Sequence, residues 1–225
     1  MLDQIEAVIF DMDGTLIDSM WVWDEIDREF FRTRQIPYSK EIQHEVEGMH
    51  IEGIATYFKN KFQLPETESE LITIWTQMAY EVYQKEVDYK HGVRRFLTHL
   101  KKNQIKMGIA TSNSIEMVDA IKHRLNFQDY FHCIVTSAEV NVGKPAPDVY
   151  LEAAKQLNVR PENCLVFEDI PMGMLAGKNA GMKVCGVHDY SSMDQEDLKK
   201  KHCDYYIQSF HDLFSLSSEE TNNEF

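Results

Sequence analysis

Six short apolar runs, most of them containing β-branched residues, alternate with stretches of helical spacing over much of the chain. The runs cover residues 7–10, 107–110, 133–135, 164–167, 184–187 and, more weakly, 205–207. Continuous apolar runs of this length, bounded by turn residues, are typical of strands buried on both faces. Because such strands alternate with helices, the pattern predicts an α/β fold, with a Rossmann-like parallel sheet core flanked by helices.

This alternation is interrupted after the first run, since no strand signal occurs between about residues 19 and 87. Apolar residues in this region instead repeat at the spacing of helix faces that pack in a core. They form three sets: Met20, Trp23, Ile26 and Phe30; Ile51, Ile54, Ala55, Phe58 and Phe62; and Leu71, Trp75, Met78 and Val82. We therefore expect a small helical (four-helix) cap over residues 19–87, inserted after the first strand of a core formed by residues 1–18 and 88–225.

The charge balance limits the class of partner. Acidic residues outnumber basic residues by 37 to 23 in the 225-residue chain, which gives a formal net charge of −14. This charge repels nucleic acid and anionic membrane surfaces, so neither is expected as a partner. No stretch approaches the ~20 apolar residues that span a bilayer, and the first residues do not resemble a signal peptide. Four dispersed cysteines without a CxxC pair are expected to be reduced thiols, and the protein to be cytoplasmic.

The strongest chemical signal is the segment DMDGTL, residues 11–16, which directly follows the first predicted strand. Ligands bind beyond the carboxyl ends of strands in an α/β sheet, and the two-residue spacing puts Asp11 and Asp13 on one side of an extended chain. Two carboxylates this close repel each other unless a proton or a cation lies between them. A hard divalent cation with oxygen ligands, Mg²⁺ before others, would stabilise them. A solvated acidic turn is the alternative for this motif alone.

Two further segments are candidates for phosphate binding. Thr111, Ser112 and Asn113 lie between a predicted strand and a predicted helix, where a hydroxyl group and free amides form an anion site. Lys144 stands between a glycine and a proline, and its ammonium group is a point charge suited to phosphate. Each segment alone is also compatible with an ordinary cap or a surface turn.

A last pair of acids, Glu168 and Asp169, ends the fourth predicted strand, at the same edge of the sheet as Asp11. Either could complete the oxygen shell of a metal ion. Since all these side chains follow strand ends or adjoin them, they converge on one edge of the sheet. Together they predict one site for a divalent cation and a phosphoryl group.

The four motifs, in this order, resemble those of the haloacid dehalogenase-like hydrolase superfamily, and the helical insertion resembles the small cap of its β-phosphoglucomutase-like branch. The resemblance implies that Asp11 is a nucleophile that forms an aspartyl-phosphate and that Asp13 is the general acid and base. It implies further roles for the other motif residues. The phosphoryl oxygens would be held by Thr111, Ser112 and Lys144, and Mg²⁺ by the Asp11 carboxylate, the Asp13 carbonyl and Asp169, with Glu168 nearby or supporting.

Within this branch, two positions separate a mutase from a phosphatase. The cap of a β-phosphoglucomutase resembles Gly-Val-Ser-Arg at its substrate loop, whereas residues 48–51 here read Gly-Met-His-Ile, so that Ile51 falls on the arginine position. The mutase pattern also has a histidine where this chain has Trp23. Both departures remove polar groups suited to a second phosphate. We therefore expect a Mg²⁺-dependent phosphatase of a small phosphorylated metabolite, with a sugar phosphate as the first candidate, and expect Trp23 and His50 to shape selectivity.

Two alternatives remain at the level of sequence. Another cap residue such as Arg28 or Lys61 could replace the missing arginine, which would make the protein a β-phosphoglucomutase-type mutase. The chain could also be a non-catalytic binding protein on the same fold, although all four motifs are intact. The sequence names neither the substrate nor the oligomeric state, and a monomer is compatible with it.

Overall fold

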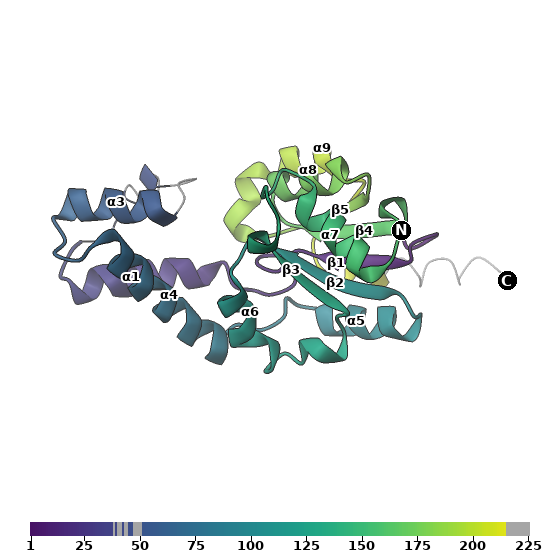
Figure 1. The fold of residues 1–225 in the computed structure, drawn as a ribbon, viewed down its shortest axis with the longest axis horizontal. Helices are drawn as coiled ribbons and strands as arrows, with labels where there is room; N and C mark the ends of the chain where they lie inside the picture. The colour runs from purple at the N-terminus through teal and green to yellow at the C-terminus, as the bar shows by residue number, and fades with distance from the viewer. Residues whose placement is uncertain (38, 40–41, 43–44, 47–50, 215–225) are drawn as a thin grey trace. The chain divides into compact units, whose positions relative to one another are not determined.

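The computed structural model describes all residues except 38, 40–41, 43–44, 47–50 and 215–225 (Figure 1). The chain divides into two compact units. The first is formed by Met1–Ser19 with Val87–Phe225, and the second by Met20–Glu86. In the described part of the chain, no helix is both long enough and apolar enough to cross a membrane. All four cysteines are free thiols.

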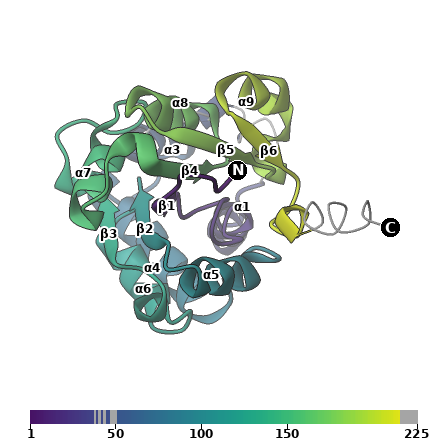
Figure 2. The same ribbon diagram turned by 90° about the vertical axis from the view of Figure 1, so that its right-hand side faces the viewer.

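The first unit is built around a parallel sheet of six strands in the order β3-β2-β1-β4-β5-β6 (Figure 2). The strands are β1 (Ala7–Phe10), β2 (Lys106–Thr111), β3 (Cys133–Thr136), β4 (Cys164–Glu168), β5 (Lys183–Val187) and β6 (Tyr205–Ile207). Each lies within one residue of a predicted run, which confirms the α/β prediction. β1 is fully buried and pairs with β2 on one side and β4 on the other.

Helices cover both faces of this sheet, as Figure 2 shows. One face carries α7 (Asp148–Leu157), α8 (Pro171–Asn179) and α9 (Glu196–His202), and the other carries α5 (Val93–Lys102) and α6 (Ile115–Lys122). Because side chains alternate along a strand, β1 serves both cores. Ile9 packs in the cluster formed with α7 and α8, whereas Phe10 stacks on Phe167 at 5.3 Å and meets Phe96 of α5 at 6.2 Å between ring centroids.

The packing of α7 differs from its sequence pattern in one detail. The spacing of Tyr150, Leu151, Ala154 and Leu157 predicts that all four lie on one buried helix face, but Leu151 is 40% exposed. The buried stripe runs instead through Val149 and Tyr150 to Ala153, Ala154 and Leu157. A helix that lies flat on a sheet buries adjacent pairs of residues one turn apart, and Leu151 falls just beyond the edge of that stripe.

The second unit contains helices α1 (Trp21–Thr33), α3 (Ile51–Phe62) and α4 (Glu68–Lys85) among its described residues. α4 begins at a capping box, in which Thr67 and Glu70 satisfy each other's backbone amides. Aromatic rings form the core of this unit, with Phe31 and Phe58 5.0 Å apart and Phe30 and Trp75 5.4 Å apart. The fourth expected helix would lie between α1 and α3, where residues 38, 40–41, 43–44 and 47–50 are outside the described residues.

Candidate active site

The register of the sheet brings the predicted site residues to one edge. Phe10, the last residue of β1, is opposite Ile109 of β2 and Phe167 of β4. The ladder continues by one more bond, from the Asp11 amide to the Phe167 carbonyl at 3.0 Å. Asp11 is therefore level with the start of the Glu168-Asp169 pair. Thr111 ends the neighbouring strand on the other side.

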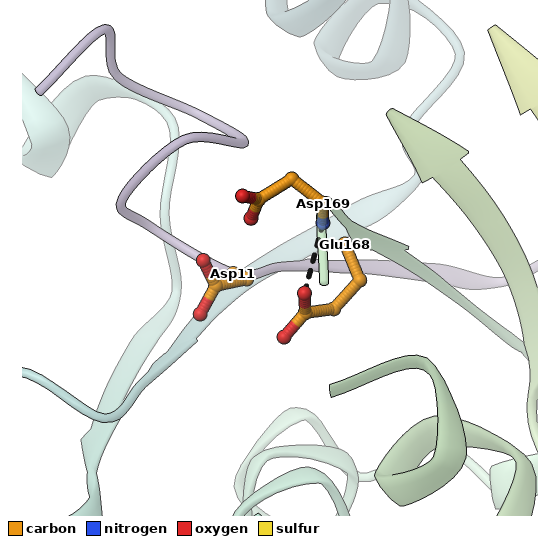
Figure 3. Close-up of side chains that lie close together, drawn as sticks. All are labelled: Asp11, Glu168 and Asp169. Atoms are coloured by element: carbon orange, nitrogen blue, oxygen red, sulfur yellow. Dashed lines mark hydrogen bonds between the residues drawn. The ribbon is translucent and has the colours of Figure 1, made fainter. Parts of the chain in front are cut away.

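Three acidic side chains form a cluster at this edge, shown in Figure 3. Asp11 comes from the end of β1, and Glu168 and Asp169 come from the end of β4. One carboxylate oxygen from each lies within 4.8 Å of the others, and all three residues are buried. The structure thus brings together the three acids that the sequence analysis places at this edge of the sheet.

Lys144 places a positive charge inside this cluster. Its Nζ donates to Asp11 Oδ1 at 2.6 Å, to Glu168 Oε1 at 2.8 Å and to the Ala110 carbonyl at 3.2 Å. Its side chain is 5% exposed. Burial alone lowers the pKa of Lys144, but Asp11 and Glu168 raise it well above its usual range, so the ammonium group stays charged. The turn from Gly143 to Pro145 thus directs the Lys144 side chain inward, in contrast to the surface turn that was the alternative for this segment.

Glu168 is fixed by the protein on both of its oxygens. Oε2 accepts from the amides of Asp169 at 2.8 Å and Ile170 at 3.0 Å, and Oε1 accepts from Lys144 and from the Tyr150 hydroxyl at 3.3 Å. Gly173 makes room for this carboxylate, because a Cβ at that position would lie 1.5 Å from Oε1. Glu168 therefore anchors Lys144.

Asp169 is held from the loop that follows β1. The Thr15 hydroxyl donates to Asp169 Oδ1 at 2.8 Å, and this bond is buried. Gly14 has a φ of +75°, and a Cβ there would come within 2.4 Å of Asp169 Oδ2. Only glycine accommodates both the left-handed backbone and this close approach. The two motifs are thus packed directly against each other.

With all three carboxyl groups ionised, the negative charge of this cluster exceeds that of Lys144 and is balanced only by protons or by a bound cation. Burial raises the pKa of Asp11 to about 8; Lys144 opposes this rise and Glu168 adds to it. Burial, Glu168 and Asp11 likewise raise the pKa of Asp169 well above its usual range. Three buried carboxyl groups face one lysine, and their oxygens are the donors that hard divalent cations prefer. The residues present therefore fit a divalent metal ion.

Asp13 lies beside this cluster and is held by two side chains. Ser19 Oγ donates to Asp13 Oδ1 at 2.7 Å, and Asn113 Nδ2 donates to Asp13 Oδ2 at 3.1 Å. The sequence suggested Asn113 as part of a phosphate site, but its side-chain amide contacts the second acid of the motif. The backbone amide of Asn113 donates to Thr111 Oγ1 at 2.9 Å, and this hydrogen bond closes the turn after β2.

The remaining predicted site residues lie at the end of β2, in the turn after it, or in the second unit, and one of them is outside the described residues. Thr111 is buried at the end of β2, and Ser112 is exposed in the turn before α6, where its carbonyl accepts from Ser137 Oγ at 3.0 Å. Trp23 belongs to the second unit, in the first turn of α1, and is half-buried. His50 lies outside the described residues.

Sequence reasoning missed three side chains that hold the acids. In the sequence, Thr15 is only one residue of the DMDGTL motif, Ser19 marks the boundary of the predicted cap, and Tyr150 lies on an apolar helix face. Thr15 and Ser19 lie four and eight residues after Asp11. Threonine and serine are also the residue types that commonly cap the N-terminus of a helix, so their identity does not point to a role beside an acid. Tyr150 does fill the core, yet its hydroxyl needs a buried partner, which is Glu168.

Comparison with known proteins identifies the family. The family model described as "Haloacid dehalogenase-like hydrolase" matches residues 8–187. The chain is 32% identical to a Drosophila melanogaster protein named "Probable pseudouridine-5'-phosphatase", with 84% of each chain covered. It is 30% identical to the "Phosphorylated carbohydrates phosphatase" of Thermotoga maritima, over 80% of this chain and 83% of that protein.

A solved structure agrees with these relatives. The crystal structure described as a "putative beta-phosphoglucomutase from Thermotoga maritima" superimposes with a TM-score of 0.82 at 28% identity and covers 95% of this chain and 99% of that one. Since the relatives include enzymes named as phosphatases, the prediction of a phosphoric monoester hydrolase is confirmed. The chain is an enzyme that belongs to the haloacid dehalogenase-like hydrolases.

Proposed function

We propose that this protein is a Mg²⁺-dependent phosphatase that hydrolyses a small phosphorylated metabolite, of the sugar phosphate type, through an aspartyl-phosphate on Asp11. One observation carries the proposal: a buried aspartate at the end of the central strand shares a lysine with Glu168 and lies next to Asp169. Phosphoryl transfer asks a protein mainly for positioning and for neutralisation of charge. This cluster provides both.

The first step is attack by a carboxylate oxygen of Asp11 on phosphorus. Lys144 orients the Asp11 carboxylate through Oδ1 and sets a fixed positive charge beside the transferring group. The Thr111 hydroxyl and the Ser112 amide, at the end of β2, would hold phosphoryl oxygens. Because a chain of net charge −14 repels phosphate at long range, the local positive charge at this edge has to bind it.

Asp13 supplies the proton transfers. It would protonate the departing oxygen of the substrate and then take a proton from the water that attacks the aspartyl-phosphate. Its two oxygens accept from Ser19 and Asn113, which fix the plane of the carboxyl group. These contacts leave the position of Asp13 defined by side chains from two separate segments.

The acidic cluster supports a proposal for the metal-binding residues. Asp11 and Asp169 would hold Mg²⁺ together with the carbonyl of Asp13, which the resemblance to the family implies, and Glu168 would support the site through Lys144. When bound, the ion neutralises charge on the phosphoryl oxygens. We place the protein in the cytosol as part of the proposal, because all four of its cysteines are free thiols and the cytosol keeps thiols reduced.

The names of the relatives give the substrates to test first. One is named for pseudouridine-5'-phosphate and another for phosphorylated carbohydrates, so both classes enter the panel. The runner-up is a β-phosphoglucomutase-type mutase, which the description of the T. maritima structure favours. Ile51 and Trp23 argue for the phosphatase, because they replace polar groups suited to a second phosphate.

The test is a screen of phosphorylated metabolites with Mg²⁺, scoring free phosphate and isomerised product separately. Besides the two classes above, the panel includes β-glucose-1-phosphate primed with glucose-1,6-bisphosphate, with product read by a coupled glucose-6-phosphate dehydrogenase assay. We expect phosphate release to exceed isomerisation on every substrate. Isomerisation faster than phosphate release would make the protein a mutase.

The matched control is Asp11→Asn. It keeps the size of the side chain but removes the charge that attack and metal binding need, so turnover should be abolished in a folded protein. Activity at the wild-type level in that variant would contradict the nucleophile assignment. If the wild-type protein released no phosphate from any substrate and yielded no isomer, the proposed function would be wrong and the alternative of a non-catalytic binding protein would remain.

A further inference from the structure

Another lysine of the first unit, Lys90, is partly buried and takes no part in the mechanism proposed above. Its Nζ donates to the Gly14 carbonyl at 2.8 Å, to the His188 carbonyl at 2.9 Å and to Asp189 Oδ2 at 2.6 Å. An ammonium group has three N–H donors, so these three acceptors use its full capacity. The side chain of Lys90 is 16% exposed and that of Asp189 only 6%.

These contacts connect two loops at the catalytic edge of the sheet. Gly14 belongs to the loop after β1, one residue beyond Asp13, and His188 directly follows β5. β4 lies between those two strands in the sheet, so Lys90 bridges across the end of a strand. Asp189 is itself fixed, because it accepts from the Ser191 amide at 2.9 Å and from the Ser191 hydroxyl at 2.6 Å.

The backbone of Lys90 binds the same loop at its other end. The Lys90 amide donates to the Leu16 carbonyl at 3.0 Å. Leu16 belongs to a turn over residues 14–17, in which the Gly14 amide donates to the Ile17 carbonyl at 3.0 Å. Gly14 allows this turn, with its φ of +75°, but a glycine also makes an unrestrained backbone more mobile than any other residue does. The hydrogen bond from Lys90 Nζ to the Gly14 carbonyl restrains the backbone at the residue that follows Asp13.

We infer that Lys90 is a positioning residue, which acts through the Gly14 carbonyl to hold Asp13 in place for proton transfer. The inference rests on the proposed function, since it assigns Lys90 a part in the acid–base step of that reaction. Lys90 contacts neither of the side chains proposed for the chemistry at Asp11 and Asp13 in any hydrogen bond of the described structure. The effect of Lys90 on the rate is therefore indirect. It should be larger for substrates whose leaving group needs protonation more.

The test compares two esters of similar size, phenyl phosphate and p-nitrophenyl phosphate, with Lys90→Met. Phenolate is the more basic leaving group and needs protonation more than p-nitrophenolate does. A displacement of ~1 Å in a catalytic group costs on the order of 100-fold. We expect Lys90→Met to lower kcat by about 10- to 100-fold on phenyl phosphate and by a clearly smaller factor on p-nitrophenyl phosphate.

Two further variants separate positioning from folding. Lys90→Met leaves the buried Asp189 carboxylate without its cation, so Lys90→Met/Asp189→Asn removes that charge while the Gly14 carbonyl still lacks its donor. The unequal loss on the two esters should persist in this double variant. The matched control is Lys178→Met, because Lys178 also pairs with an aspartate, Asp204, but is 41% exposed and touches no catalytic loop. It should leave both rates unchanged.

Amide hydrogen exchange of residues 14–17 gives a readout that does not depend on activity. It should be faster in both Lys90 variants than in the wild type. Equal losses on the two esters, or exchange that matches the wild type, would overturn the inference while the proposed function stands. A wild-type protein inactive on both esters and on the metabolite panel would instead refute the proposed function.

Discussion

Replacing Gly173 with alanine tests how tightly the acidic cluster is packed. A Cβ at this position in α8 would lie 1.5 Å from Glu168 Oε1 and 2.0 Å from its Cδ, whereas real Cβ atoms essentially never come closer than 3.0 Å. The carboxylate or the helix must therefore move by about 1.5 Å. Helix propensity alone predicts the opposite effect, a gain of about 1 kcal/mol from glycine to alanine inside a helix.

The cost follows from what Glu168 binds. Its carboxylate accepts from Lys144, Tyr150 and two backbone amides, and a shift of this size breaks at least one of those bonds. Hydrogen bonds to charged groups contribute about 1.5–3 kcal/mol, and overpacking costs about 1–3 kcal/mol. After the gain in helix propensity, Gly173→Ala should destabilise the protein by roughly 2–5 kcal/mol. Because Glu168 orients Lys144, phosphatase activity should fall by on the order of 100-fold.

The assay is chemical denaturation together with phosphate release under Mg²⁺. Gly143→Ala is the matched control, because a Cβ there meets no atom within 4 Å even though the residue adjoins Lys144. It should be silent in both measurements. If Gly173→Ala were as stable and as active as the wild type, the account of Glu168 as the anchor of Lys144 would be wrong.

Two further predictions concern the acids themselves. Asp13→Asn keeps the backbone carbonyl but cannot transfer a proton, so the rate should fall ~10²- to 10⁴-fold for substrates with basic leaving groups and less for p-nitrophenyl phosphate; equal losses would contradict the role. Since burial raises the pKa of Asp11 to about 8, a proton competes with the cation below that pH, and Mg²⁺ affinity should rise with pH and level off above it. Calorimetric titration in buffers of different ionisation enthalpy measures the released proton, and an affinity that does not change between about pH 6 and about pH 9 would contradict this assignment.

The sheet was predictable because burial leaves a direct mark on sequence. A strand covered on both faces must be apolar at every position, and β1, which is buried at all of its positions, reads Ala-Val-Ile-Phe without interruption. Once parallel strands are placed, their carboxyl ends share an edge, so the convergence of Asp11 with Glu168 follows from topology alone. Helix faces are harder to predict, because Leu151 and Ala153 flank the stripe of Tyr150, Ala154 and Leu157 on opposite sides. The rotation of the helix about its own axis decides which flank is buried.

The roles of the acids do not follow from the spacing of the residues, because they depend on which donor reaches which oxygen. By spacing alone, Glu168 and Asp169 are equivalent candidates for a metal ligand, and only the resemblance to the family implies that Asp169 is the ligand and Glu168 a supporting residue. In the structure, Glu168 accepts from four protein donors, two on each oxygen, whereas Asp169 receives one hydroxyl group, that of Thr15. A carboxylate already engaged on both oxygens has little left for a cation. This geometry supports the proposal that Asp169 is the ligand and that Glu168 keeps a charged lysine beside Asp11, a distinction that no spacing between residues encodes.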